Sequence, residues 1–163
     1  MRNSLLRDRD LPPILIHASD RKKFEERDST PMFNDGASML IEHVKWLAES
    51  EREFGPATAP ITFGRIFTPL AENPTWVIPG GMKQCFANAT VYALARDDVN
   101  YVEGFALDLD MPRPIQHAWI VDDRGQAIDP TWQENADQVY YGIPFNKSLV
   151  AEILKTAGLV VAC

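Results

Sequence analysis

Residues 79–95 read PGGMKQCFANATVYALA, and this stretch places Cys85 between a glycine pair and a predicted helix. The helix is expected to start near Gln84 and to run to about Arg96. A thiol in the first turn of a helix faces unpaired backbone N–H groups and the positive end of the helix dipole, and both favour the thiolate. The alternative is a structural role, because free cysteine is among the most buried residue types.

The composition indicates one globular domain that spans residues 1–163. The chain is 45% hydrophobic and 24% charged, which is ordinary for a protein with a packed core. Residues 1–34 are charged and interrupted by prolines, so we expect them to be extended or partly mobile. The residues that indicate a function lie within 80–145.

The net charge and the lack of long apolar runs argue against nucleic acid and membranes as partners. The net charge of −7 is unsuited to binding nucleic acid, which needs lysine and arginine to neutralise phosphates. The sequence shows no run of about 18 apolar residues that could span a membrane, and no secretory signal. The two cysteines, Cys85 and the terminal Cys163, make no disulfide framework. A cytoplasmic location is therefore predicted.

The order of predicted elements indicates an α+β fold. A helix is expected from about Asn34 to Phe54, followed by loop with short strands in residues 56–81 (ITFGRIFTPL and TWVI). Strands are then expected at 101–107, 115–121 and 126–132, and a last helix at about 147–157. Because the strands cluster late in the chain, an antiparallel sheet is predicted, with the helix that carries Cys85 packed on it.

A histidine and an aspartate in neighbouring predicted strands suggest a partnership with Cys85. His117 shares a strand face with apolar residues, where its ring needs a hydrogen-bond partner. Asp129 lies twelve residues further on, across the turn DDRG. The two share a face if the loop, with or without a glycine bulge, is centred near Asp123, whereas a strict two-residue loop puts them on opposite faces. A core histidine and a turn aspartate before Pro130 are the simpler alternatives.

Together these residues form a possible Cys-His-Asp triad. The motifs KQCFANA, IQHAWIV and AIDPTW resemble those of the transglutaminase-like branch of papain-like cysteine enzymes. This resemblance implies Cys85 as nucleophile, His117 as base and Asp129 as orienting carboxylate, on a papain- or transglutaminase-like core. It covers less than half of the chain, and the superfamily includes proteases, amide hydrolases, transamidases and acyltransferases.

Other polar and aromatic residues near these motifs are candidates for the oxyanion hole or the cleft. The backbone N–H of Cys85 is one expected donor, and a side-chain amide could supply a second. Glu103 could line the cleft or face solvent, and the tryptophans could wall the site or belong to the core. The candidates are Gln84, Asn88, Gln116, Glu103, Trp119 and Trp132.

The predicted function is thiol-dependent acyl transfer, in the first place hydrolysis of an amide, peptide or isopeptide bond. Its substrate would be a protein, a peptide or a small amide, with no cofactor and no metal. A metal site is disfavoured because no close-spaced pair of ligands occurs, although His17 and His43 are further potential ligands. The alternatives are a transamidase or acyltransferase with the same triad, and a non-catalytic binding module. The sequence does not predict the oligomeric state.

Overall fold

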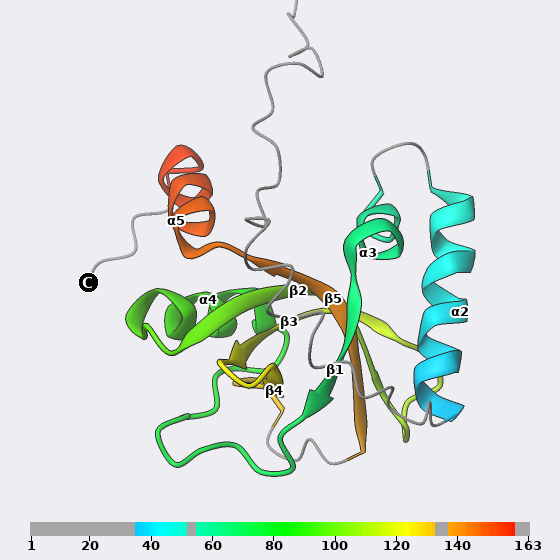
Figure 1. Ribbon diagram of the computed structural model, residues 1–163, viewed down its shortest axis with the longest axis horizontal. Helices are drawn as coiled ribbons and strands as arrows, with labels where there is room; N and C mark the ends of the chain where they lie inside the picture. The colour runs from blue at the N-terminus through cyan, green and yellow to red at the C-terminus, as the bar shows by residue number, and fades with distance from the viewer. Residues whose placement is uncertain (1–34, 52–54, 133–136, 159–163) are drawn as a thin grey trace, which may run out of the picture. The chain divides into compact units, whose positions relative to one another are not determined.

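The computed structural model describes residues 35–51, 55–132 and 137–158, which belong to a unit that runs from Pro31 to Cys163. The predictions for residues 1–34, His17 and Cys163 lie outside the described residues. None of the described helices is both long and apolar enough to cross a membrane. The elements, shown in Figure 1, are α2 (Asp35–Ser50), α3 (Thr58–Phe63), β1 (Arg65–Pro69), α4 (Cys85–Ala95), β2 (Val99–Asp108), β3 (Ile115–Asp122), β4 (Gln126–Ile128), β5 (Gln138–Phe145) and α5 (Lys147–Thr156).

The strands close into a barrel in the order β1, β4, β3, β2, β5, and β5 pairs again with β1. Neighbouring strands are antiparallel except for β1 and β4, which run parallel with Thr68 opposite Gln126. The longest strand, β2, pairs with β3 on one side and with β5 on the other. Its central residues are therefore held by backbone hydrogen bonds from both neighbours.

The predicted fold class is wrong. The sequence predicts an α+β domain in which a papain- or transglutaminase-like core carries a helix on an antiparallel sheet. The described residues instead form a closed barrel of five strands with one parallel pair. The prediction fails because it contains no strand at 138–145, where β5 joins β2 to β1 and closes the barrel.

The proline-rich stretch before the Cys85 helix also differs from its prediction. Residues 61–70 were expected to be a strand, but α3 ends at Phe63 and only β1 is extended. Tertiary contacts hold α3, since the Tyr141 hydroxyl donates to the Pro60 carbonyl at 2.7 Å. The predicted strand at 75–78 is absent, and β4 ends at Ile128 rather than at Trp132. In both cases contacts distant in sequence outweigh β-propensity.

The turn between β3 and β4 sets the register of the two strands. Ile120 lies opposite Ile128, which leaves a three-residue loop at 123–125. Gly125 takes a φ of 81°, a conformation that glycine adopts without steric cost. In this register residues 117 and 129 are diagonal neighbours on the same face of the sheet. The loop is centred on Arg124, one residue beyond the predicted centre near Asp123, and it is not the two-residue loop that would place the pair on opposite faces.

Bulky side chains fill the barrel because two facing glycines leave them room. Gly104 lies opposite Gly142 across β2 and β5. A Cβ atom on Gly104 would lie 2.2 Å from the Tyr141 carbonyl oxygen, and one on Gly142 would lie 2.7 Å from Cη2 of Trp119. The buried residues of this interior cluster are Phe67, Val102, Ala106, Trp119, Val121, Ala127, Trp132 and Tyr140.

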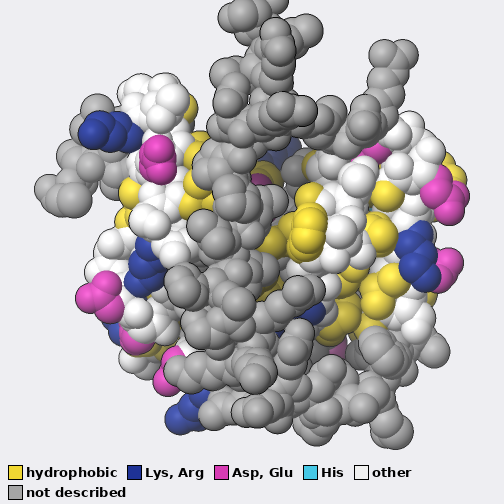
Figure 2. Space-filling model, turned by 45° about the horizontal axis from the view of Figure 1, so that its top comes forward, with side chains coloured by type: hydrophobic (Ala, Val, Ile, Leu, Met, Phe, Trp, Pro, Cys, Tyr) yellow, Lys and Arg dark blue, Asp and Glu magenta, His cyan; other side chains and the backbone are white. Residues whose placement is uncertain are grey.

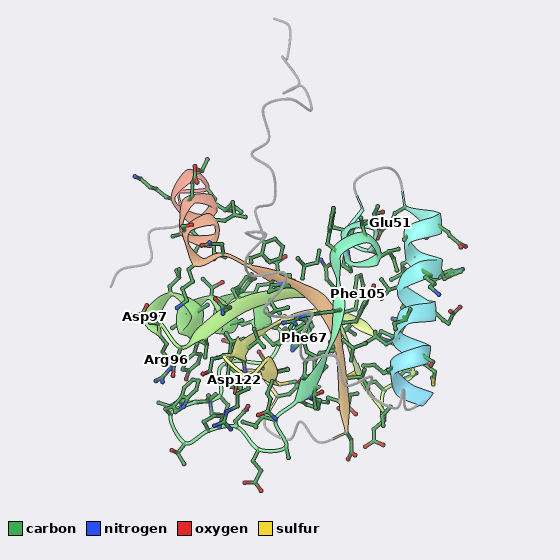
Figure 3. All side chains as sticks on the ribbon, viewed as in Figure 1. Glu51, Phe67, Arg96, Asp97, Phe105 and Asp122 are labelled. Atoms are coloured by element: carbon green, nitrogen blue, oxygen red, sulfur yellow. The ribbon has the colours of Figure 1, made fainter. Side chains whose placement is uncertain are left out.

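Helices cover two regions of the outer barrel wall. Ala89 and Ala93 of α4 pack on Ala118 and Ile120 of β3, in a cluster that also includes Tyr101. On the other side, α2 packs on Phe105, Leu107, Val139 and Tyr141 of β2 and β5. In Figure 3, Phe67 lies within the barrel, whereas Phe105 lies on the side of α2. Side chains on the outer face of β2 thus pack in the clusters of both α4 and α2.

Some large apolar side chains remain exposed outside these clusters. Met39 and Trp46 on α2 are 60% and 62% exposed, and Phe63 at the end of α3 is 51% exposed. Hydrophobic side chains are visible among charged ones of both signs on the face shown in Figure 2. Single exposed apolar residues are normal on protein surfaces.

Replacing Gly104 by alanine is expected to destabilise the barrel by about 1–3 kcal/mol, because the new methyl group would collide with the backbone of β5. Urea unfolding would measure this loss. Gly81→Ala is the matched control, since its methyl group would meet only the flexible end of Gln84. Equal stability of the Gly104→Ala and Gly81→Ala proteins would contradict the prediction.

Candidate active site

Cys85 is the first residue of α4, as the sequence predicts, and its side chain is 8% exposed. A turn precedes it, in which Lys83 takes a φ of 64° and the Gln84 N–H donates to the Gly81 carbonyl at 3.3 Å. A non-glycine residue at positive φ is uncommon and costs about 1 kcal/mol or more. The turn thus ends in a helix start at which the thiol lies beside free backbone N–H groups.

The early end of β4 places Cys85 against β3. β4 pairs with β3 only at Ile120 and Val121, so the beginning of β3 has no strand neighbour on that side. There the Ala118 N–H donates to the Cys85 sulfur, and the Phe86 N–H donates to it from within α4. A backbone group of a strand therefore contributes to holding the sulfur.

The environment of Cys85 favours its thiolate. Burial raises the pKa of the thiol, but the hydrogen bond and the positive charge of His117 oppose this, together with the N–H groups of Ala118 and Phe86. The net effect is a pKa below the ordinary value of a cysteine. The balance is typical of reactive cysteines rather than of structural ones.

His117 lies between the thiol and a carboxylate. Its Nε2 atom is 2.6 Å from Oδ2 of Asp129, so the ring nitrogen that remains for Cys85 is Nδ1. Burial lowers the pKa of His117, but the hydrogen bonds and negative charges of Asp129 and Cys85 outweigh it and raise the pKa to about 9. The lowered pKa of the thiol and the raised pKa of the imidazole both favour an imidazolium–thiolate ion pair.

Aromatic rings hold the imidazole in place. The ring of Trp132 stacks on His117 with centroids 4.4 Å apart and planes 15° apart. Trp119 lies on the same strand with its centroid 6.4 Å from that of His117, and it belongs to the barrel interior. Both candidate tryptophans are therefore near the histidine, with Trp132 in direct contact.

Every oxygen of the Asp129 carboxylate has hydrogen-bond donors. Oδ1 accepts from the backbone N–H groups of Thr131 at 2.8 Å and Trp132 at 3.1 Å. Oδ2 accepts from His117 and from the Tyr140 hydroxyl at 2.9 Å. The residue is fully buried, and these bonds compensate the cost of burying its charge.

The sequence predicts Tyr140 only as a residue at the far rim of the cleft, not as a partner of Asp129, and it predicts no role for Asn73. Tyr140 also hydrogen-bonds to Gln138 within the barrel. The Asn73 amide donates to the carbonyls of Asp129 at 2.6 Å and Trp132 at 3.0 Å, and its oxygen accepts from the Asp129 N–H. Asn73 is 56 residues from Asp129, and no local sequence signal connects the two.

The amide candidates for the oxyanion hole differ in their surroundings. Both hydrogens of the Asn88 amide are engaged, by the Gly81 carbonyl and the Thr131 hydroxyl, each at 3.0 Å. Asn88 therefore ties the loop before Cys85 to the segment after Asp129, and the Gly80 N–H supports this by donating to the Pro130 carbonyl. Gln84 and Gln116 are exposed. The backbone N–H of Cys85 remains the predicted oxyanion donor.

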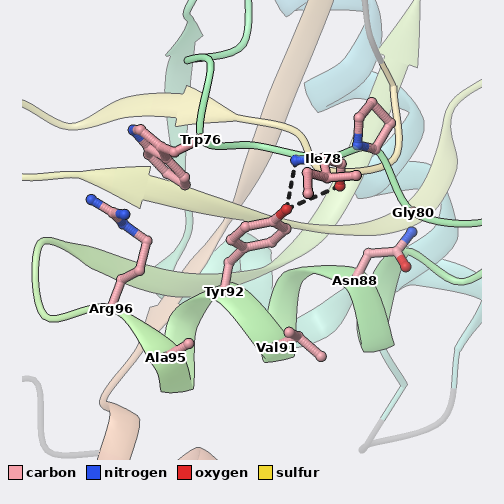
Figure 4. Close-up of a pocket in the computed structure, with 9 residues that line it drawn as sticks. Trp76, Ile78, Gly80, Asn88, Val91, Tyr92, Ala95 and Arg96 are labelled. Carbon is pink, nitrogen blue, oxygen red and sulfur yellow. Dashed lines mark hydrogen bonds between the residues drawn. The ribbon is translucent and has the colours of Figure 1, made fainter.

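A cavity of about 480 Å³ lies along α4, with Gly80 and Asn88 at one end and Arg96 at the other (Figure 4). Its polar groups are occupied: the Tyr92 hydroxyl bonds to both backbone groups of Ile78, and Arg96 lies on the ring of Trp76 while pairing with Asp98. None of Cys85, His117 and Asp129 lines this cavity, although Asn88, which bonds to Thr131, does.

Within the described ranges, no group of three or more His, Cys, Asp or Glu side chains is arranged to hold a metal ion. His43, named as a potential ligand, lies in α2 with its ring 5.8 Å from that of Trp46.

Comparisons of the chain with protein-family models, curated proteins and solved structures found no match. The site is therefore defined by its own geometry.

The charge of His117 gives a pH prediction. Its pKa is raised from 6.5 to about 9, so protonation of His117 contributes its full stabilisation below pH 6.5 and loses it as the pH rises through about 9. NMR titration of the His117 ring should show this raised pKa, and Asp129→Asn should lower it. A titration near 6.5 in the native protein would contradict the ion pair.

Tyr140→Phe should destabilise the protein by about 1–3 kcal/mol, because it removes a hydrogen bond to a buried carboxylate and retains the ring. Urea unfolding at pH 7 measures the effect. Tyr92→Phe is the matched control, since its hydroxyl bonds only to backbone groups at the surface and a smaller loss is expected. Equal losses in the two variants would show that the bond to Asp129 contributes no extra stability.

Proposed function

We propose that this protein is a thiol-dependent acyl-transfer enzyme that hydrolyses an amide, peptide or isopeptide bond through a thioester. The observation that supports the proposal is the connected series of Cys85, His117 and Asp129. A thiol with a lowered pKa, a histidine with a raised pKa and a saturated carboxylate lie in hydrogen-bonded sequence. Each group has the partner that its role in nucleophilic catalysis requires.

The reaction begins with attack of the Cys85 thiolate on the substrate carbonyl carbon. The negative charge moves to the carbonyl oxygen, where the Cys85 backbone N–H at the start of α4 would donate a hydrogen bond. The His117 imidazolium then gives its proton to the leaving amine, which allows the C–N bond to break and leaves a thioester on Cys85.

The second half of the reaction regenerates the thiolate. Neutral His117 takes a proton from water, and the hydroxide attacks the thioester, so that the carboxylic acid leaves and the ion pair forms again. An amine in place of water would make the same site a transamidase. Asp129 accepts the Nε2–H bond throughout and so keeps Nδ1 directed toward the sulfur.

The motif resemblance to transglutaminase-like cysteine enzymes supports this chemistry and remains a prediction. The fold that it implies is wrong for this protein, because the strands close into a barrel. Three further points are likewise predictions from the sequence. They are a cytoplasmic location, a substrate that is a protein, a peptide or a small amide, and the absence of nucleic acid as a partner.

Thiol reactivity tests the proposal without a known substrate. Alkylation of Cys85 by iodoacetamide should be fast well below pH 8.5, the pKa of a free thiol, and His117→Ala should slow it at least ten-fold at pH 6. Peptide-resolved mass spectrometry between pH 5 and 9 measures the rate. His43→Ala, which changes a histidine of α2, is the control and should match the native protein.

An acyl-enzyme is the second readout of the same experiment. p-Nitrophenyl acetate should acetylate Cys85 transiently, whereas Cys85→Ala should give no acetylation at this site, and His117→Ala and Asp129→Asn should slow it by roughly 100-fold or more. Alkylation that rises only near pH 8.5 and is unchanged by His117→Ala would refute the mechanism and leave a binding module as the function.

A further inference from the structure

Glu103 lies on the outer face of β2 between the two helical clusters. Tyr101, two residues before it, packs in the cluster beneath α4, and Phe105, two residues after it, packs in the cluster beneath α2. Side chains that are two residues apart in a strand share a face. Glu103 therefore stands on the outer barrel wall between α4 and α2, where it is only partly buried.

The strand register brings Glu103 close to the nucleophile. Glu103 lies directly opposite Ala118 in the pairing of β2 with β3. Ala118 is the residue whose N–H donates to the Cys85 sulfur. One strand spacing, about 5 Å, thus separates the backbone of Glu103 from the backbone group that holds the thiolate.

Hydrogen bonds fix the Glu103 carboxylate relative to α4. The Tyr101 hydroxyl donates to Oε1 of Glu103 at 2.7 Å. Thr90, in the second turn of α4, hydrogen-bonds in turn to the Tyr101 hydroxyl. The carboxylate is therefore held through α4, the helix that begins with Cys85, rather than extending freely into solvent.

Within the part of the chain that the structure describes, no cationic side chain pairs with Glu103. None of the ion pairs among residues 35–51, 55–132 and 137–158 involves it, although Lys45, Arg96 and Lys147 of the same region each pair with an acidic residue. A carboxylate that is fixed by a hydrogen bond and lies one strand away from the backbone group that holds the thiol can accept hydrogen bonds from a positive group on a bound substrate.

We propose that Glu103 and Tyr101 form a subsite for an ammonium or guanidinium group of the substrate, next to the scissile bond. This inference rests on the proposed acyl-transfer function. The cation serves recognition and is not an attacking acceptor, because a protonated amine has no free electron pair with which to attack the thioester. The substrate class is therefore an amide or peptide that carries a basic group.

Charged thiol reagents of similar size test the subsite. The probes are 2-aminoethyl methanethiosulfonate, which is cationic, 2-sulfonatoethyl methanethiosulfonate, which is anionic, and the neutral methyl reagent. Their rates at Cys85 are measured at pH 7 by peptide-resolved mass spectrometry. In Glu103→Gln the cationic rate, relative to the neutral one, should fall about five-fold, and the anionic rate should rise by a similar factor.

A matched control separates the subsite from the net charge. Glu152→Gln removes one exposed carboxylate from α5 and should leave the rate ratios as in the native protein. The effect of Glu103→Gln should shrink at high ionic strength, because salt screens the interaction. Unchanged ratios in Glu103→Gln, equal changes in Glu152→Gln, or protection of Cys85 from both charged reagents would overturn the subsite.

Failure of the cation subsite can be distinguished from failure of the proposed function. Fast alkylation of Cys85 by iodoacetamide at pH 6 without charge selectivity would leave the thiol enzyme standing and remove the cation subsite. Slow alkylation at pH 6 would remove the thiol enzyme and the subsite with it.

Discussion

The hydrogen bond between His117 and Asp129 is the interaction on which the site depends. The barrel makes it possible, because the register of β3 and β4 brings the two residues to one face. A carboxylate that is fully buried must find donors for both oxygens, and here two backbone N–H groups, a tyrosine and the histidine supply them. If one donor is lost, the charge stays buried with less compensation. The stability of the fold therefore depends on the same hydrogen bonds that orient the imidazole.

The position of the nucleophile depends on a different feature, the early end of strand β4. Because β4 stops at Ile128, β3 has a free edge at Ala118, and the first residue of α4 occupies it. The same interruption lets the chain after Ile128 turn so that Asp129 and Trp132 contact the histidine. A β4 that continued to Trp132 would pair with β3 and take the Ala118 N–H from the sulfur.

Parts of this arrangement follow from local sequence patterns. The start of α4 at Cys85 and the strand around His117 depend on neighbouring residues, and the predictions for them agree with the structure. The loop with Gly125 is centred one residue later than predicted, and His117 and Asp129 still share a face. The closed barrel does not follow from local patterns, because the pairing of β5 with β1 joins residues more than 70 positions apart. Tyr140 and Asn73 reach Asp129 only through that closure and the long loop, so no periodicity indicates them.

What the sequence determined by itself is the set of reactive groups and their local settings: a thiol at a helix start, and a histidine and an aspartate brought to one face by the turn between their strands. These depend on hydrogen bonds and dihedral angles within a few residues. Only the tertiary structure decided that the sheet closes, that Tyr140 and Asn73 hold the carboxylate, and that Glu103 lies on the outer wall opposite Ala118. Such contacts depend on which distant surfaces pack together, and burial in a closed barrel turns three local features into one connected site.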